Sequence, residues 1–200
     1  MKLLFSPTSP FARKVRITAL ETGLFDRIEM APIDTEDPNS GLAAHNPLRK
    51  IPVLQTEFGP LYDSPVICEY LDTLHTGPKL FPATGAARWQ ALRAQALADG
   101  LKDAALLLRY ERTLRPADRQ SDSWIERQRL KIANALDRME ADGAEFDGVL
   151  TIGGISVACA LGYLDFRFSD WDWRKTHPFL ATWHHHFAAR PSYAATQPPA

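Results

Sequence analysis

The pattern of the chain changes at residues 75–85, "HTGPKLFPATG", which hold two prolines and two glycines. Before this stretch, short apolar runs typical of strands alternate with helical spacing, in the order βαβ and then ββα. After it, only helical patterns follow. This order predicts an α/β domain over residues 1–77 and an all-helical domain over residues 86–200. A chain of 200 residues is long enough to bury a core in each.

In the first domain we expect strands at 2–5, 28–31, 52–56 and 58–62, and helices at 10–22 and from Ser64 to Leu74. Ser64 is the expected N-cap of the latter helix, with Pro65 at its first position. The polar stretch "DTEDPNSGLAAHNPLRK" predicts a long irregular connection. In the second domain we expect helices at 88–114, 122–141, 156–168 and 178–188. The helix at 156–168 is almost wholly apolar, which favours a buried central helix. On the helix at 122–141, the expected core residues are Trp124, Ile132, Leu136 and Met139.

Composition narrows the possible partners and location. Formal net charge is −1, from 23 basic and 24 acidic residues, which argues against nucleic-acid binding and against electrostatic attachment to a membrane. No stretch approaches the ~20 apolar residues that span a bilayer, and "MKLLF" breaks at Ser6-Pro7, unlike a secretory signal. Cys68 and Cys159 lie far apart and form neither a disulfide framework nor a metal cluster. We therefore expect a cytoplasmic protein without a metal.

The segment "SPTSPFARKVR", residues 6–16, has the layout of a thiol-handling loop but contains no cysteine. Ser9 precedes Pro10 at the start of the first helix, where free N–H groups and the helix dipole stabilise a thiolate. An N-cap role for Ser9 is compatible with this. The basic residues Arg13, Lys14 and Arg16 are expected to form a solvated face.

Two further segments have the residue types of a peptide-binding site. In "NPLRKIPVL", Pro52 indicates either a rigid strand start or a cis Ile51–Pro52 bond that turns the neighbouring backbone outward, with Lys50 as a cation for a carboxylate. In "YDSPVI", Ser64 at a helix start is suited to bind a carboxylate, and Asp63 is suited to bind an ammonium. A carboxylate and an ammonium on one carbon make an amino-acid head group. An ordinary cap and turn is the alternative there.

These three segments, in this order and spacing, resemble the bacterial cytosolic glutathione S-transferases with a serine-type active site. "ISVACALGYLDF" and "RPSYAAT" also fit, so the resemblance covers essentially the whole chain. It implies a thioredoxin-like N-terminal domain, a helical-bundle C-terminal domain, a homodimer, and glutathione as co-substrate. It further implies that Ser9 stabilises the glutathione thiolate and that the tripeptide is held by Phe11, Lys50, the Ile51 backbone, Pro52, Asp63 and Ser64.

The implied activity is transfer of glutathione to a small hydrophobic electrophile, as in detoxification. Leu106, Arg109 and Tyr110 lie on the first long helix of the second domain, which usually walls the family's acceptor pocket. Of these, Leu106 and Tyr110 are the expected acceptor-pocket residues. One departure is Ser156-Val-Ala-Cys159, where the family commonly has a Ser/Thr-x-x-Asp capping box at a helix start. A non-catalytic binding or interaction protein and a glutathione-dependent peroxidase are the alternatives. Trp171 and Trp173 are expected to plug a loop against the core, with lining of an acceptor pocket as the alternative. Three consecutive histidines at 184–186 cannot converge on a metal.

Overall fold

The computed structural model describes residues 1–199, which form two compact units. The first contains Met1–Ala83 together with the segment that begins at Ala189, and the second is Thr84–Ala188. The predicted second domain, residues 86–200, therefore differs from the observed unit at its C-terminal end. The last segment belongs with the first unit because side chains of the first helix bind it, as described below.

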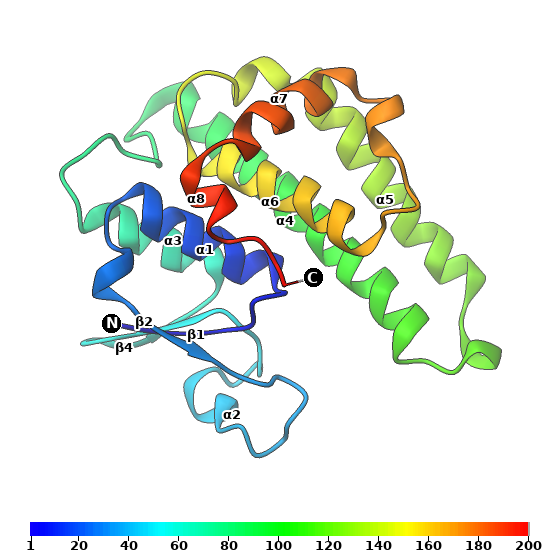
Figure 1. Ribbon diagram of the computed structural model, residues 1–200, viewed down its shortest axis with the longest axis horizontal. Coiled ribbons are helices and arrows are strands. Elements are labelled where there is room, and N and C mark those ends of the chain that lie inside the picture. The colour runs from blue at the N-terminus through cyan, green and yellow to red at the C-terminus, as the bar shows by residue number, and fades with distance from the viewer. Residues whose placement is uncertain (200) are drawn as a thin grey trace. The chain divides into compact units, whose positions relative to one another are not determined.

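The first unit is built on a four-stranded sheet in the order β2-β1-β3-β4 (Figure 1). Strand β1 is Lys2–Phe5, β2 is Glu29–Pro32, β3 is Val53–Thr56 and β4 is Gly59–Leu61. β1 runs parallel to β2 and antiparallel to β3, and β3 runs antiparallel to β4. The short apolar run predicted as the first strand is buried over Leu3, Leu4 and Phe5, as a central strand requires.

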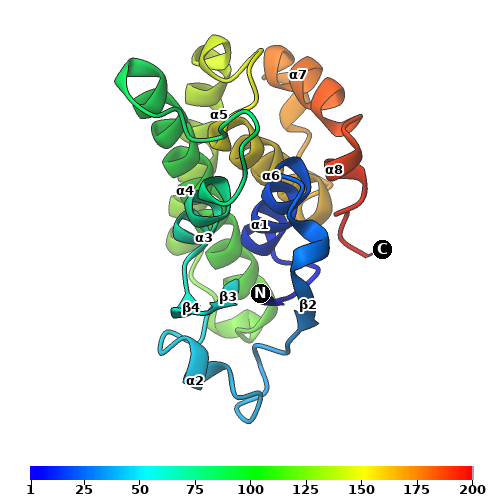
Figure 2. The ribbon, with the colours of Figure 1, turned by 90° about the vertical axis from the view of Figure 1, so that its left-hand side faces the viewer.

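Helices α1 (Pro10–Glu21) and α3 (Ser64–Thr73) cover one face of this sheet, and the short α2 (Leu42–His45) lies on its other side (Figures 1 and 2). The predicted apolar face of α1 is confirmed, since Ala12, Val15 and Ala19 are fully buried. Helix α2 falls in the connection predicted to be irregular. It forms there because Leu42 packs against Leu4 and Val53.

The prediction of a solvated basic face on α1 was wrong, since even Arg16 is half-buried, and its Nη2 donates to the Ala195 carbonyl at 3.5 Å. Arg13 is 4% exposed and Lys14 is fully buried. Arg13 Nη2 donates to the Tyr193 carbonyl at 3.1 Å, and its guanidinium lies 3.9 Å from the centroid of the Tyr193 ring. Tyr193 belongs to α8 (Pro191–Ala194), in the tail. A sequence pattern confined to α1 carries no sign of this distant cover.

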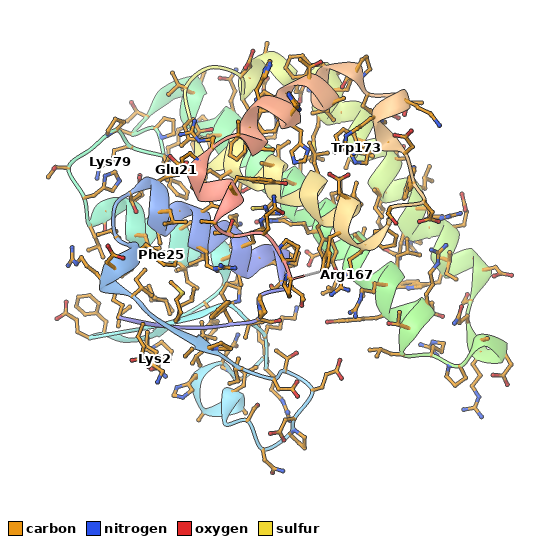
Figure 3. All side chains as sticks on the ribbon, in the orientation of Figure 1. Lys2, Glu21, Phe25, Lys79, Arg167 and Trp173 are labelled. Atoms are coloured by element: carbon orange, nitrogen blue, oxygen red, sulfur yellow. The ribbon has the colours of Figure 1, made fainter. Side chains whose placement is uncertain are left out.

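The tail is also fixed at the other end of α1. Arg190 donates from Nε and Nη2 to the two carboxylate oxygens of Glu21, at 2.9 and 2.8 Å, and the Ser192 hydroxyl donates to the same carboxylate. Figure 3 labels Glu21 beside this part of the chain. The tail is thus bound to α1 by charge-assisted hydrogen bonds at both ends of the helix.

The second unit consists of helices α4 (Gly85–Thr113), α5 (Asp122–Ala141), α6 (Ile152–Arg167) and α7 (Pro178–Ala188). Helix α4 packs against both α5 and α6, and α7 packs against α5 and α6. Every residue of α6 from Ile152 to Leu164 is buried, which confirms the predicted central helix. Short 3₁₀ turns complete the fold, at Phe25–Arg27 in the first unit and at Ala117–Arg119, Gly143–Glu145 and Trp173–Lys175 in the second.

Helix α6 begins four residues earlier than predicted, at Ile152 with Thr151 as N-cap. Ser156 is therefore inside the helix, where its hydroxyl donates to the Ile152 carbonyl at 2.8 Å, and it does not cap the helix start. Gly153 is part of the reason. A Cβ at Gly153 would lie 2.9 Å from the Ala91 carbonyl oxygen and 2.9 Å from the Ala94 Cβ on α4. Gly153 therefore allows α6 and α4 to approach closely.

The remaining core predictions are confirmed except for one residue. Ile132, Leu136 and Met139 are buried, but Trp124 is 39% exposed, so its assignment to the core was wrong. Trp173 is buried and donates from Nε1 to Asp165 at 2.9 Å (Figure 3). Both cysteines are buried and neither forms a disulfide within residues 1–199. Within residues 1–199 there is no group of three His, Cys, Asp or Glu side chains suited to a metal, and no helix has the length and apolar character needed to cross a membrane.

Candidate functional site

Sheet topology gathers the three candidate segments at one edge of the first unit. The register pairs Leu4 with Val53 and Leu54 with Leu61. Because β1 and β4 both run antiparallel to β3, the end of β1, the start of β3 and the end of β4 meet at the same edge. The loop to Ser9 follows the end of β1, and the start of α3 follows the end of β4. The residues before Val53 lead into the start of β3. The sequence order of the motifs therefore becomes a spatial cluster.

An apolar cluster fixes two of these segments against each other. It consists of Leu4, Leu42 and Val53, and both Ile51 and Tyr62 pack on it. Ile51 precedes Pro52, and Tyr62 precedes Asp63. The backbone on either side of the candidate site thus rests on one shared core, which holds it in a defined position without a ligand.

Ser9 lies at the start of α1 as predicted and is the N-cap of that helix. Its Oγ accepts a hydrogen bond from the Ala12 amide at 3.2 Å, and Phe11 occupies the first turn beside it. Within the described residues, the Ser9 hydroxyl proton has no acceptor. The cap bond therefore orients the oxygen while its proton stays available for donation to a ligand.

Ser6, the other serine of the loop, is used differently. Its Oγ lies 3.1 Å from the Thr8 Oγ1 and accepts from the Thr8 amide at 3.4 Å, while its carbonyl accepts from the Ser9 amide at 3.1 Å. Ser6 therefore shapes the turn that brings Ser9 to the helix start.

The Ile51–Pro52 peptide bond is cis, which decides between the two alternatives for Pro52. The loop before it is held by Asn46, which is 2% exposed. Asn46 Nδ2 donates to the Lys50 carbonyl at 2.9 Å, and Asn46 Oδ1 accepts from the Leu48 amide at 3.0 Å. The Lys50 side chain itself is exposed to solvent. We did not predict a role for Asn46, although an Asn-Pro pair at a turn is a signal for such side-chain bonds.

The start of α3 differs by one residue from the prediction. Asp63 is the N-cap, without a side-chain cap bond, and Ser64 is the first helical residue. Asp63 is exposed, whereas Ser64 is 1% exposed. The Ser64 hydroxyl is buried and has no hydrogen-bond partner among the described residues. A buried hydroxyl without a partner costs free energy, and this one lies in the first turn, where backbone N–H groups are also unpaired.

The predicted acceptor residues belong to the second unit. Leu106 is half-buried and Tyr110 is 39% exposed, both on α4. The sequence prediction placed Arg109 on the same helix as Tyr110 but missed two residues of α6. Tyr163 interacts electrostatically with both, and Arg167 interacts with Arg109. Burial raises the pKa of the Tyr163 phenol, and the two arginines oppose this. The spacing of Tyr163 and Arg167, four residues apart on one helix, is a signal that pairs them.

Comparisons with known proteins agree on one family. Residues 8–74 match the model of the glutathione S-transferase N-terminal domain, and residues 122–186 match that of the C-terminal domain. A curated Escherichia coli K12 protein, described as the uncharacterized GST-like protein YibF, is 39% identical, and the match covers 100% of this chain and 99% of that protein.

Solved structures give the same result. A glutathione transferase family member from Pseudomonas fluorescens Pf-5 with bound glutathione has a TM-score of 0.96 and 45% identity, with 100% of this chain and 99% of that chain covered. A glutathione S-transferase from Methylobacillus flagellatus KT with bound glutathione has a TM-score of 0.93 and 39% identity, with 99% of both chains covered.

Proposed function

The chain belongs to the glutathione S-transferase family, and from this premise we propose that it binds glutathione and transfers it, as the thiolate, to a small hydrophobic electrophile. The observation that carries the proposal is the Ser64 hydroxyl, buried without a partner at the first turn of α3. A carboxylate at this position would accept from the hydroxyl and from free backbone N–H groups. The γ-glutamyl end of glutathione supplies such a carboxylate, and its ammonium suits Asp63.

The remaining contacts follow from the same orientation of the tripeptide. The backbone of Ile51, fixed by Pro52 and the apolar cluster, is the proposed partner of the cysteinyl residue of glutathione. Lys50 is exposed and is the proposed partner of the glycine carboxylate. Phe11, in the first turn of α1, is proposed to line the space around the thiol.

Ser9 is the proposed catalytic residue. Its hydroxyl accepts from Ala12 and so directs its proton outward, toward the position where the thiol sulfur is expected. A donor to the sulfur stabilises the thiolate over the thiol, and each unit by which the thiol pKa falls corresponds to about 1.4 kcal/mol. In the transfer, the thiolate sulfur attacks the electrophilic carbon, an S–C bond forms, and the leaving group departs with its electron pair.

The direct test uses the wild-type protein. Isothermal titration with glutathione, followed by conjugation of a simple aryl halide, measures binding and transfer separately. We expect saturable binding and a rate above the uncatalysed reaction. Binding without conjugation across a panel of electrophiles would favour the glutathione-binding interaction protein instead, and turnover of peroxides alone would favour the peroxidase. Absence of glutathione binding would contradict the proposal.

Family membership also leads us to propose a homodimer in the cytoplasm. Phe58 is 76% exposed at the turn between β3 and β4, with its ring edge-on to that of Tyr70, and such an exposed aromatic suits a subunit contact. Buried cysteines that form no disulfide fit a reducing compartment. Sedimentation equilibrium tests the dimer, which we expect to weaken in Phe58→Ser.

A further inference from the structure

The chain turns directly after α6, at residues 168–171. The Trp171 amide donates to the Phe168 carbonyl at 2.9 Å, and the Trp173 amide donates to the Trp171 carbonyl, also at 2.9 Å. Figure 3 labels Arg167 and Trp173, which flank this turn in the sequence. Phe168 and Trp173 are buried, whereas Trp171 is half-buried. The buried neighbours anchor the turn to the core and leave the Trp171 side chain partly open to solvent.

A cleft of about 390 Å³ lies between this turn and α5. Its volume is in the range of sites that hold small molecules. All of its lining residues belong to the second unit, so the cleft lies within one compact body. Four come from α5 and two from the turn: Glu126, Arg129, Leu130, Ala133, Asp170 and Trp171. The lining thus combines a cation, two carboxylates and apolar surface.

Arg129 is the cation of the cleft, and its donors are not used by the protein. The Arg129 Nε is buried and makes no hydrogen bond among the described residues. Its guanidinium carbon lies 5.8 Å from the centroid of the Trp171 ring. A buried donor without an acceptor costs free energy. A carboxylate in the cleft would remove that cost, because the planar guanidinium fork matches a carboxylate in both geometry and charge.

Glu126 and Asp170 are the two carboxylates of the lining, and both are exposed. Within residues 1–199, neither forms an ion pair with Arg129, although Glu126 lies one turn before it on α5. A ligand with only a negative charge would be repelled by the two carboxylates, and one with only a positive charge by Arg129. A ligand that carries both charges would be attracted by all three side chains.

We propose that this cleft binds a free α-amino acid with an apolar side chain. Arg129 holds the carboxylate, and Glu126 and Asp170 hold the ammonium. The side chain of the ligand packs on the half-buried Trp171 and on Leu130, which is 57% exposed without a ligand. None of these residues belongs to the proposed glutathione site in the first unit. The assignment therefore goes beyond the proposed function and does not depend on it.

The test compares three probes that differ only in their charged groups. L-Phenylalanine carries both charges, phenylpropanoate lacks the ammonium, and phenylethylamine lacks the carboxylate. Titration calorimetry with the full chain should show saturable binding of L-phenylalanine and binding of each analogue weaker by about tenfold or more, the effect of losing a hydrogen bond to a charged group. The indole N–H resonance of Trp171, identified by its loss in Trp171→Phe, should shift on addition of L-phenylalanine.

Variants assign the binding to the cleft. Arg129→Gln should weaken L-phenylalanine about tenfold and leave phenylethylamine unchanged. The double variant Glu126→Gln, Asp170→Asn should weaken L-phenylalanine and leave phenylpropanoate unchanged or tighter. Arg127→Gln, at an exposed arginine on α5, is the matched control and should bind all three probes as wild type does.

A second control, Ser64→Ala, separates this cleft from the first unit, where an amino-acid head group is also expected to bind. L-Phenylalanine affinity should be unchanged in Ser64→Ala. A loss there that is absent from Arg129→Gln would place the binding in the first unit and overturn the assignment. Absence of saturable binding to wild type, or phenylpropanoate binding as tightly as L-phenylalanine, would also overturn it. Each of these results leaves glutathione transfer untouched, because that activity is measured with other ligands.

Discussion

The Ser9 hydroxyl accepts a hydrogen bond from the Ala12 amide at 3.2 Å, so the residue that caps α1 is also the one proposed to hold the glutathione sulfur. The two roles use different parts of the hydroxyl. The oxygen lone pair serves the helix and the proton serves the ligand. Substitutions at Ser9 therefore affect stability and catalysis together, and a matched cap elsewhere in the chain is needed to separate the two effects.

Ser64→Ala is expected to change ligand affinity and stability in opposite directions. Removing a hydroxyl that donates to a carboxylate should raise the glutathione Kd about tenfold or more. Stability should stay unchanged or rise by up to about 1 kcal/mol, because the wild-type hydroxyl is buried without a partner. Titration calorimetry and urea unfolding measure the two quantities.

Ser156→Ala is the control for that substitution. Its hydroxyl is equally buried but bonded to the Ile152 carbonyl, and it lies in the other unit. We expect no change in its glutathione Kd. Equal Kd values for wild type and Ser64→Ala would mean that Ser64 does not contact the tripeptide.

Asn46 is expected to act on glutathione binding through the backbone. Asn46→Asp keeps an acceptor for the Leu48 amide but loses the donor to the Lys50 carbonyl. Titration calorimetry should therefore show weaker glutathione binding, by roughly threefold to tenfold for a hydrogen bond worth about 1 kcal/mol. The exposed Asn39→Asp provides a control with the same charge change. If both variants bind glutathione as wild type does, the Lys50 loop has no positioning role.

Glu21 makes stability depend on pH in the acid range. Hydrogen bonds from Arg190 lower the pKa of the Glu21 carboxyl, burial opposes this, and Ser192 adds to the lowering. A carboxyl with a lowered folded-state pKa stabilises the protein above its unfolded pKa, and that contribution is lost as pH falls through the folded value. Because Arg190 is 40% exposed, we expect the Glu21 carboxylate to contribute only about 1 kcal/mol to the free energy of unfolding.

Glu21→Gln should therefore lower the free energy of unfolding by about this amount at pH 7 and by less at pH 3. Urea unfolding at the two pH values measures the difference. The exposed Glu57→Gln is the control and should follow wild type at both. A constant offset between Glu21→Gln and wild type across the range would contradict the assigned role.

Gly153→Ala is expected to separate α6 from α4. The added methyl would meet the Ala91 carbonyl oxygen at 2.9 Å, and backbone does not give way cheaply. We expect a loss of about 1–3 kcal/mol in the free energy of unfolding, as for other overpacked cores. Gly100→Ala, inside α4 where an added methyl would meet no neighbouring side chain or other segment within 4 Å, should instead be neutral or stabilising by up to about 1 kcal/mol. Thermal unfolding of both variants checks the contrast.

Local sequence signals predicted the fold where the chain interacts with itself nearby. The helices Asp122–Ala141 and Pro178–Ala188 have the bounds expected from their periodicity and flanking residues. The signals failed where a distant segment decides the outcome. Arg13 and Lys14 are buried although their charges predict exposure, and Gly153 lies inside a helix because α4 passes close to it.

The candidate site shows the same division. Ser9, Ile51, Asp63 and Ser64 could be predicted as candidates because each lies at a strand end or helix start with a recognisable residue pattern. Arg109 and Arg167 were not grouped, because their proximity depends on how α4 and α6 pack. Asn46 was missed although the Asn-Pro pair signals a turn, because that signal does not show that its side chain binds both Leu48 and Lys50.

The ionisation of bound glutathione in Ser9→Ala tests the central claim most directly. Ultraviolet absorbance of the thiolate, followed against pH at saturating glutathione, gives the thiol pKa in wild type, in Ser9→Ala and in Ser121→Ala, where the same cap bond is removed from α5. Each variant should lose about 1 kcal/mol of stability. We predict that only Ser9→Ala raises the bound-thiol pKa, with a parallel fall in conjugation rate and little change in glutathione Kd. An unchanged thiol pKa and rate in Ser9→Ala would contradict the account.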